Sequence, residues 1–117
     1  MQISEPVQNA DTQETAPDIN GLLSIDYHNI KKAALILRSL NHKLRQQILR
    51  IINEDNRITV TEIYVKLRLE QSVASQHLAI LRKAGIVSTQ REGKFIFYGI
   101  NTLRVEAVQK FVNDLVG

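Results

Sequence analysis

The segment LEQSVASQHLAILRKAGIVSTQREGKFIFYGIN, from Leu69 to Asn101, limits the fold more than any other part of the chain. Its first half predicts a helix from about Ser72 to Ala84, because apolar residues recur at spacings of four and three: Ala74, Leu78 and Leu81. Gly85 follows, where glycine most easily takes the left-handed conformation that ends a helix. The opposite face carries short uncharged polar side chains in place of the usual Lys and Glu: Gln71, Ser72, Ser75 and Gln76.

Two short runs with strand-like composition follow this helix. We expect strands over Val87–Arg91 and Lys94–Ile100, joined by a tight turn at Glu92-Gly93. Basic residues lie at both sides of that turn, Arg91 before it and Lys94 after it. The pattern therefore predicts a β-hairpin with a basic tip directly after the helix.

The rest of the chain predicts further helices and one short strand. Thr59 and Glu62 form a capping-box pattern that opens a helix over Val60–Leu67, and Arg68–Gln71 is long enough only for a turn. The other expected elements are helices over Ile25–Leu40, His42–Asn53 (capped by Asn41) and Thr102–Val116 (capped by Asn101), and a strand over Arg57–Thr59. The order α-α-(β)-α-α-β-β-α is that of a mainly helical domain with a small β-hairpin, a winged helix-turn-helix.

Length and charge point to one basic domain with an acidic arm. The 117 residues suit a single domain, which we place at residues 21–117. Residues 1–20 hold four acidic residues, both prolines and no Lys or Arg, and we expect a disordered acidic arm. The chain has a net charge of +3, but residues 21–117 hold 15 basic and 8 acidic residues, a charge of +7. Such a body fits an anionic partner such as nucleic acid.

Several classes of protein are disfavoured by what the sequence lacks. The absence of Cys rules out disulfides and thiolate ligands. No signal-peptide pattern or membrane-length apolar run is visible, so we expect a cytoplasmic protein without a membrane partner. There is no Gly-rich phosphate loop or helix face with paired carboxylates, and Ser75 and His77 face different directions on their helix. We therefore expect neither an enzyme nor a cofactor.

The small polar face of the predicted helix over Ser72–Ala84 suits the reading of double-stranded DNA. The major groove is about 12 Å wide, Gln can bond adenine in bidentate fashion, and Ser can bond base edges or phosphates. The residues expected to face bases are Gln71, Ser72, Val73, Ser75, Gln76 and Ala79. The residues expected to contact the phosphate backbone are Lys43, Arg45, Lys66, Arg68, Arg82 and Lys83, with Arg91 and Lys94 on the wing. A helical scaffold with a merely solvated polar face is the alternative interpretation of these residues. Another is a winged-helix module that binds protein.

The stretch from Leu40 to Asn101 resembles the bacterial ArsR/SmtB family of dimeric winged-helix transcriptional repressors. Its recognition pattern is met by EQSVASQHLAILRKAGIV, and its second-helix pattern by Arg45, Ile48 and Leu49. The wing pattern of the family is met by Arg91, Gly93, Lys94 and Tyr98. The chain departs from the family at Glu70, Ala74, Ala79 and the NHKL segment. The resemblance implies a DNA-binding transcription regulator.

The usual metal sites of that family are not matched here. One of them needs Cys, and the other needs His and carboxylates on the last helix, where this chain has only Glu106 and Asp114, more than 10 Å apart. We interpret His77 as a packing residue and His42 as a surface residue. Asp26 and His28 could form an atypical site only across a dimer. We expect no metal, and the effector stays open among an organic molecule, a protein partner and simple abundance.

The first and last predicted helices indicate a homodimer. The last helix carries a broad apolar stripe: Leu103, Ala107, Val108, Phe111, Val112 and Leu115. The first is apolar around more than half of its circumference, and the alternative is that both helices only cover one core. Exposed on a monomer, these faces would form an unusually large apolar patch. A two-fold dimer places its recognition helices about 34 Å apart, which predicts an inverted-repeat DNA site and salt-sensitive binding.

Overall fold

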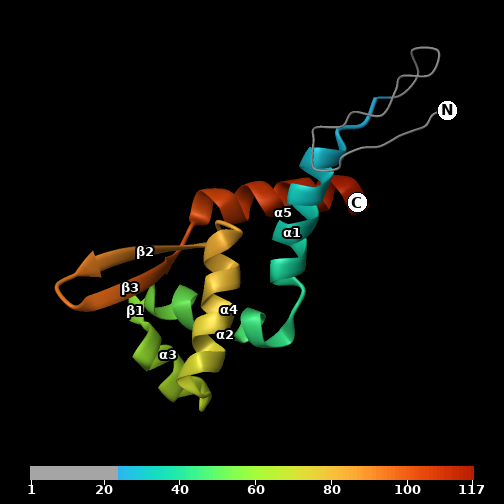
Figure 1. The fold of residues 1–117 in the computed structure, drawn as a ribbon. Helices are drawn as coiled ribbons and strands as arrows, with labels where there is room; N and C mark the ends of the chain where they lie inside the picture. Colours follow the sequence, from blue (N-terminus) through green and yellow to red (C-terminus); the bar gives the residue numbers. More distant parts are fainter. Residues whose placement is uncertain (1–23) are drawn as a thin grey trace. The chain divides into compact units, whose positions relative to one another are not determined.

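The computed structural model describes residues 24–117 and confirms the expected order of elements (Figure 1). The helices are α1 (Tyr27–Leu40), α2 (Lys43–Asp55), α3 (Val60–Leu67), α4 (Gln71–Lys83) and α5 (Thr102–Val116). The strands are β1 (Ile58–Thr59), β2 (Val87–Glu92) and β3 (Phe95–Ile100). The chain divides into two compact units after Leu37, and the larger of them is Arg38–Gly117. The expected arm at residues 1–20 lies outside the described residues.

The three strands form one antiparallel sheet in the order β1-β3-β2. Glu92 pairs with Phe95, so the hairpin turn is formed by Gly93 and Lys94, one position later than the expected Glu92-Gly93. Gly93 has a φ of +63°, and positive φ at the first of two loop residues is what a type II′ turn requires. The correction places Lys94 in the turn itself.

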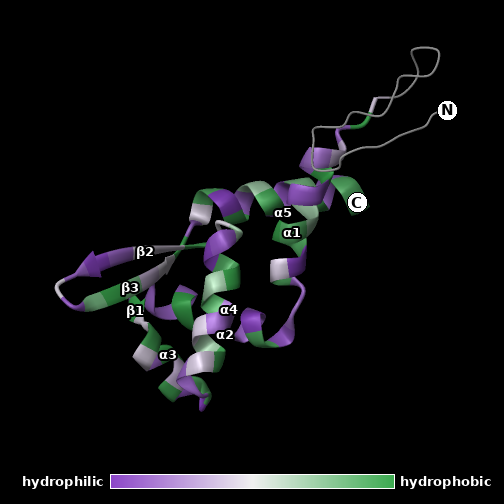
Figure 2. Cartoon of the chain, in the orientation of Figure 1, coloured by the Kyte–Doolittle hydropathy of each residue, from purple (hydrophilic) through white to green (hydrophobic). Residues whose placement is uncertain are grey.

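The core of the larger unit lies between helices α2 to α4 and the base of the sheet. Its buried apolar residues come from α2, α3, α4, β1, β2 and the loop that precedes β2: Ile48, Ile52, Ile58, Ile63, Ala74, Leu78, Leu81, Ile86 and Val87. The three that α4 contributes are those that the sequence spacing predicted. Beyond this core the hairpin extends away from the helices. Most of β2 is hydrophilic there, whereas β3 beside it is largely hydrophobic (Figures 1 and 2).

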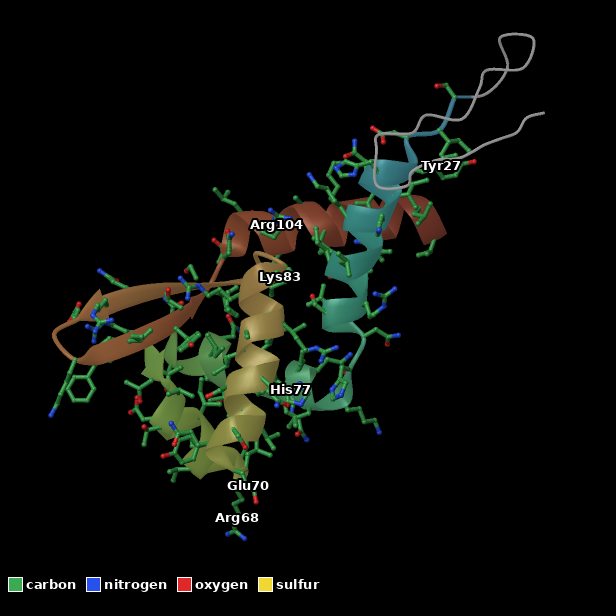
Figure 3. All side chains as sticks on the ribbon, viewed as in Figure 1. Tyr27, Arg68, Glu70, His77, Lys83 and Arg104 are labelled. Atoms are coloured by element: carbon green, nitrogen blue, oxygen red, sulfur yellow. The ribbon has the colours of Figure 1, made fainter. Side chains whose placement is uncertain are left out.

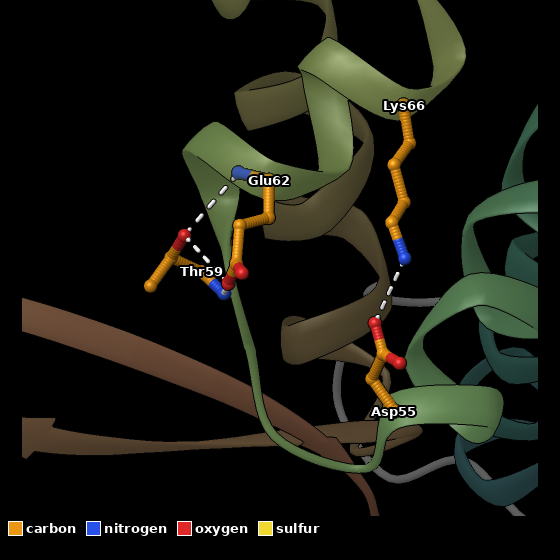
Figure 4. A network of polar contacts seen from close by, with 4 residues as sticks. All are labelled: Asp55, Thr59, Glu62 and Lys66. Atoms are coloured by element: carbon orange, nitrogen blue, oxygen red, sulfur yellow. Dashed lines mark hydrogen bonds and ion pairs between the residues drawn. The ribbon is translucent and has the colours of Figure 1, made fainter.

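Side-chain caps explain where helices α2 and α3 begin. Helix α2 is capped by His42, whose Nδ1 accepts from the backbone N–H groups of Leu44 and Arg45, and not by Asn41 as expected. Helix α3 opens with the predicted capping box of Thr59 and Glu62 (Figure 4). These caps satisfy backbone donors that have no partner within their helices.

The last helix differs from the others because none of its residues is buried. Asn101 caps α5 as predicted, by accepting from the backbone N–H of Arg104. Leu103, Leu115 and Val116 are 79%, 67% and 77% exposed. Within residues 24–117 no helix combines the length and the apolar character that crossing a membrane requires.

Candidate nucleic-acid interface

Helices α3 and α4 are joined by a three-residue turn, Arg68–Glu70. Arg68 has a left-handed backbone with a φ of +57°, and its N–H donates to the carbonyl of Val65 at 3.2 Å. The N–H of Leu69 donates to the carbonyl of Tyr64 at 2.9 Å. These bonds close the end of α3 and turn the chain sharply into α4. The sequence alone already indicated the turn, because no helix or strand fits so few residues.

The outer face of α4 carries the short polar residues that the sequence singled out. The exposed members of the expected base-facing set are Gln71, Ser72, Ser75, Gln76 and Ala79. Ser72, Gln76 and Ala79 follow one another at spacings of four and three, so they share one stripe opposite the buried face of the helix. Val73 is half-buried on the flank and has only part of its side chain available.

The first turn of α4 begins at an acidic residue. Glu70 is the N-cap, and its side chain makes no capping hydrogen bond. In Figure 3 Arg68 and Glu70 both project from this end of the helix, and Lys83 lies at the other. Glu70 therefore puts an exposed carboxylate beside the polar stripe, in a position where a phosphate-bearing partner would be repelled.

The C-terminal end of α4 is tied to the start of α5. Gly85 has a φ of +76°, as expected for the residue after this helix. The side-chain amide of Asn101 donates to the carbonyl of Gly85 at 2.9 Å, and the backbone N–H of Asn101 donates to the carbonyl of Ile86 at 2.9 Å. The Arg104 guanidinium covers the open side of Gly85. Sequence reasoning found Asn101 only as a helix cap.

The wing brings basic and aromatic side chains together. Arg91 and Lys94 are exposed, and the Lys94 Nζ lies 5.5 Å from the centre of the Phe95 ring. Sequence reasoning missed Arg57, whose guanidinium stacks 3.7 Å from the centre of the Phe97 ring and pairs with the Glu92 carboxylate. The sequence placed Arg57 in an expected strand over Arg57–Thr59, but no local pattern indicated that this strand pairs with β3.

Most of the other expected phosphate contacts are exposed cations. The exposed set comprises Lys43, Lys66, Arg68, Arg82 and Lys83. Lys66 donates to the Asp55 carboxylate at 3.0 Å (Figure 4), and this hydrogen bond raises the pKa of the lysine. The positive charge of Lys66 is thus partly compensated by its neighbour. None of the other four forms an ion pair with an acid of residues 24–117, which leaves them better suited to bind an anion.

Arg45 is the one member of the expected phosphate-contacting set that the structure removes from the surface. It is 7% exposed, and its guanidinium donates to the carbonyls of Ser39 at 2.7 Å and Arg38 at 3.1 Å. Its third partner is the Nδ1 of His77, at 3.2 Å. The assignment of Arg45 to a phosphate contact is therefore corrected: its donors are used inside the protein.

His77 packs where the sequence interpretation placed it. Burial lowers its pKa, and the nearby His42 and Arg45 lower it further. In Figure 3 its side chain points from α4 toward the start of α2. Across the part of the chain that the structure describes, no three His, Asp or Glu side chains gather to hold a metal ion.

Residues 42–89 match the profile described as "Bacterial regulatory protein, arsR family". The chain is 37% identical over 87 residues to the transcriptional activator HlyU of Vibrio cholerae, covering 74% of this chain and 80% of that protein. It is 32% identical over 91 residues to the transcriptional repressor PagR of Bacillus anthracis, covering 78% and 91%. The solved structure of HlyU from Vibrio cholerae superposes with a TM-score of 0.59 at 36% identity, over 75% of this chain and 95% of HlyU.

Proposed function

Because the chain belongs to the bacterial ArsR family of DNA-binding transcription regulators, we propose that it represses transcription by binding an inverted-repeat promoter site as a homodimer. The family and the two relatives are regulators and not enzymes. We infer the contact residues and the dimer from the exposure, charge and apolar character of particular side chains.

The observation that carries the proposal is the exposed polar stripe of α4. The side chains on this stripe are exposed: Ser72, Gln76 and Ala79. The opposite face of the same helix is fully buried. Short side chains let a helix lie deep in the major groove, and Gln can discriminate adenine through two hydrogen bonds. We propose that this stripe, with Gln71, Ser75 and part of Val73, reads the bases.

The exposed cations support backbone contacts around that stripe. Arg82 and Lys83 end α4, and Arg91 and Lys94 occupy the wing. With Lys43, Lys66 and Arg68, these residues would neutralise several phosphates in each protomer. Each neutralised phosphate releases counterions, so binding should weaken steeply as salt increases. A cytoplasmic location is proposed together with this function, because the promoter DNA of a bacterium lies in the cytoplasm.

Helix α5 supports the homodimer. Four of its apolar residues are about half exposed or more: Leu103, Phe111, Leu115 and Val116. Helix α1, taken by itself, leaves Ile30 and Leu35 about half exposed. Each Å² of apolar surface that is buried stabilises the buried state by about 25 cal/mol, and this free energy favours pairing with a second copy. A two-fold pair would present two α4 helices to two half-sites about 34 Å apart.

Repression is proposed over activation because it demands less of the protein. A dimer bound across a promoter can block access without contacting the transcription machinery. PagR is named a repressor, and so is the biofilm growth-associated repressor of Agrobacterium fabrum, whereas HlyU is named an activator. Transcription from the bound promoter, measured with and without the protein in a purified system, decides the direction.

The contact face is tested by fluorescence anisotropy with labelled upstream DNA at low ionic strength. The Gln76→Ala/Arg91→Ala pair should lower affinity for the preferred sequence by about tenfold or more. The matched control is Gln47→Ala/Arg50→Ala, which removes the same residue types from the exposed face of α2. It should change affinity less than about twofold. Equal effects of the two pairs would show that the assigned face is wrong.

A further inference from the structure

Arg45 is a buried cation without a carboxylate partner among residues 24–117. Two of its nitrogens are held by carbonyl groups in the last turn of α1: Nε donates to Ser39 and Nη2 to Arg38. Gln46 adds a third bond to that turn, from its Nε2 to the carbonyl of Leu40 at 2.8 Å. The guanidinium is thereby fixed in place, with Nη1 left to face α4.

The group that meets Nη1 is the imidazole of His77. Arginine can only donate hydrogen bonds, so the Nδ1 of His77, 3.2 Å away, must accept. The neutral ring then carries its proton on Nε2. Protonation at Nδ1 would set an N–H against an N–H and two positive charges side by side, which turns the contact from attraction to repulsion.

The second titratable neighbour of His77, His42, also favours the neutral form of His77. His42 lies with its ring centre 4.9 Å from that of His77, and its Nδ1 is already used to accept the backbone N–H groups at the start of α2. The charged or titratable groups that act on His77 are thus His42 and Arg45, both basic. No acid among them would offset a proton gained by His77.

We propose that Arg45 is a positioning residue for the recognition helix, acting through His77, and that DNA binding requires this histidine to be neutral. Arg45 is anchored on two carbonyls and enclosed, so it cannot withdraw from a charged His77. The movement must come from α4, in which His77 directly follows Gln76 of the polar stripe. This inference rests on the proposed reading of DNA by α4.

The direction of the pH dependence follows from the pKa of His77, which burial and its two basic neighbours lower. The pKa of a histidine in an unfolded chain is about 6.5. The neutral form therefore stabilises the fold fully above that pH, and the contribution is lost as the pH falls from there through the lower folded pKa. Nonspecific electrostatics act in the opposite sense, because added positive charge favours DNA. A loss of affinity in acid thus separates the two effects.

The test is DNA affinity from about pH 7.5 to about pH 5.5 at constant ionic strength, for the full chain and two variants. The wild-type protein should lose affinity on the order of tenfold, because in acid His77 must give up a proton before the protein binds DNA. His77→Gln keeps an acceptor for Arg45 but cannot titrate, so its affinity should stay flat or rise in acid. His28→Gln, in α1, removes a histidine outside the cluster and should retain the wild-type profile.

Thermal unfolding over the same pH range provides a readout that needs no DNA. The wild-type melting temperature should fall more steeply in acid than that of His77→Gln. If the two proteins share one pH profile in both measurements, the inference is overturned. A further outcome is that Gln76→Ala leaves DNA affinity unchanged while His77→Gln still flattens both pH profiles. In that case the inferred role of the Arg45–His77 contact is supported, and the proposed base-reading face of α4 is wrong.

Discussion

The side-chain amide of Asn101 donates a hydrogen bond to the carbonyl oxygen of Gly85 at 2.9 Å, across 16 positions of sequence. The same side chain caps α5 through its oxygen, which accepts from the N–H of Arg104. One residue thereby begins the helix proposed for dimerisation and holds the end of the helix proposed for recognition. A shift at the start of α5 would therefore strain the hydrogen bond to the C-terminal end of α4.

Asn101→Asp should separate these two roles. The carboxylate still caps α5, but it cannot donate to Gly85 and brings a negative charge to a carbonyl oxygen. We expect a loss of about 1–2 kcal/mol in the free energy of unfolding, measured by urea denaturation, with a drop in DNA affinity. Asn113→Asp makes the same chemical change on the exposed surface of α5 and should alter stability far less. Equal losses would argue against the link.

Gly85→Ala should be more harmful than Gly93→Ala, although both glycines have positive φ. An added Cβ at Gly85 would lie 3.2 Å from the Arg104 guanidinium, whereas one at Gly93 would meet nothing within 4 Å. The backbone penalty is about 1–2 kcal/mol at either position, and only Gly85→Ala must also displace a neighbour. Thermal melts of Gly85→Ala with and without Arg104→Ala test this: the second change should recover part of the loss.

Glu70→Ser should strengthen both the fold and DNA binding. Serine can cap α4, which Glu70 does not, for a gain of about 0.5–1 kcal/mol in the free energy of unfolding. Removing the carboxylate also lowers repulsion from phosphates. Glu70→Gln is the matched variant, because it removes the charge without adding a good cap. It should raise DNA affinity in anisotropy titrations and leave the melting temperature nearly unchanged. A serine variant that binds DNA more weakly would contradict the proposed repulsion.

Phe111→Glu should convert the proposed dimer to monomer. Phe111 is 49% exposed and no residue of α5 is buried, so a charge there is accommodated in a monomer and costly in an apolar interface. Sedimentation velocity should give roughly half the mass of the wild-type species at about micromolar concentration, with the helical circular-dichroism spectrum retained. Lys110→Gln, one position away and exposed, is the control. A dimer that persists in Phe111→Glu would place the interface elsewhere.

Local patterns were enough to predict most of the fold. The bounds of α3 and α5 agree with the expected ones, because a capping box at Thr59 and a capping Asn at 101 are signals carried by neighbouring residues. The buried side of α4 was likewise predicted from spacing alone. The hairpin turn was displaced by one residue, because the register of β2 against β3 is decided by pairing along the whole strands.

The sequence by itself determined the order of the elements, the buried and polar faces of α4, and the resemblance to a family of regulators. Each of these depends on the periodicity of nearby residues. The tertiary structure alone decided which cations are available to DNA. Arg45 and Arg82 look alike in the sequence, but Arg45 is enclosed by groups up to 32 positions away, while Arg82 stays exposed at the end of its helix. The role of a charged side chain depends on the partners that folding brings within hydrogen-bonding distance, and no local pattern contains that information.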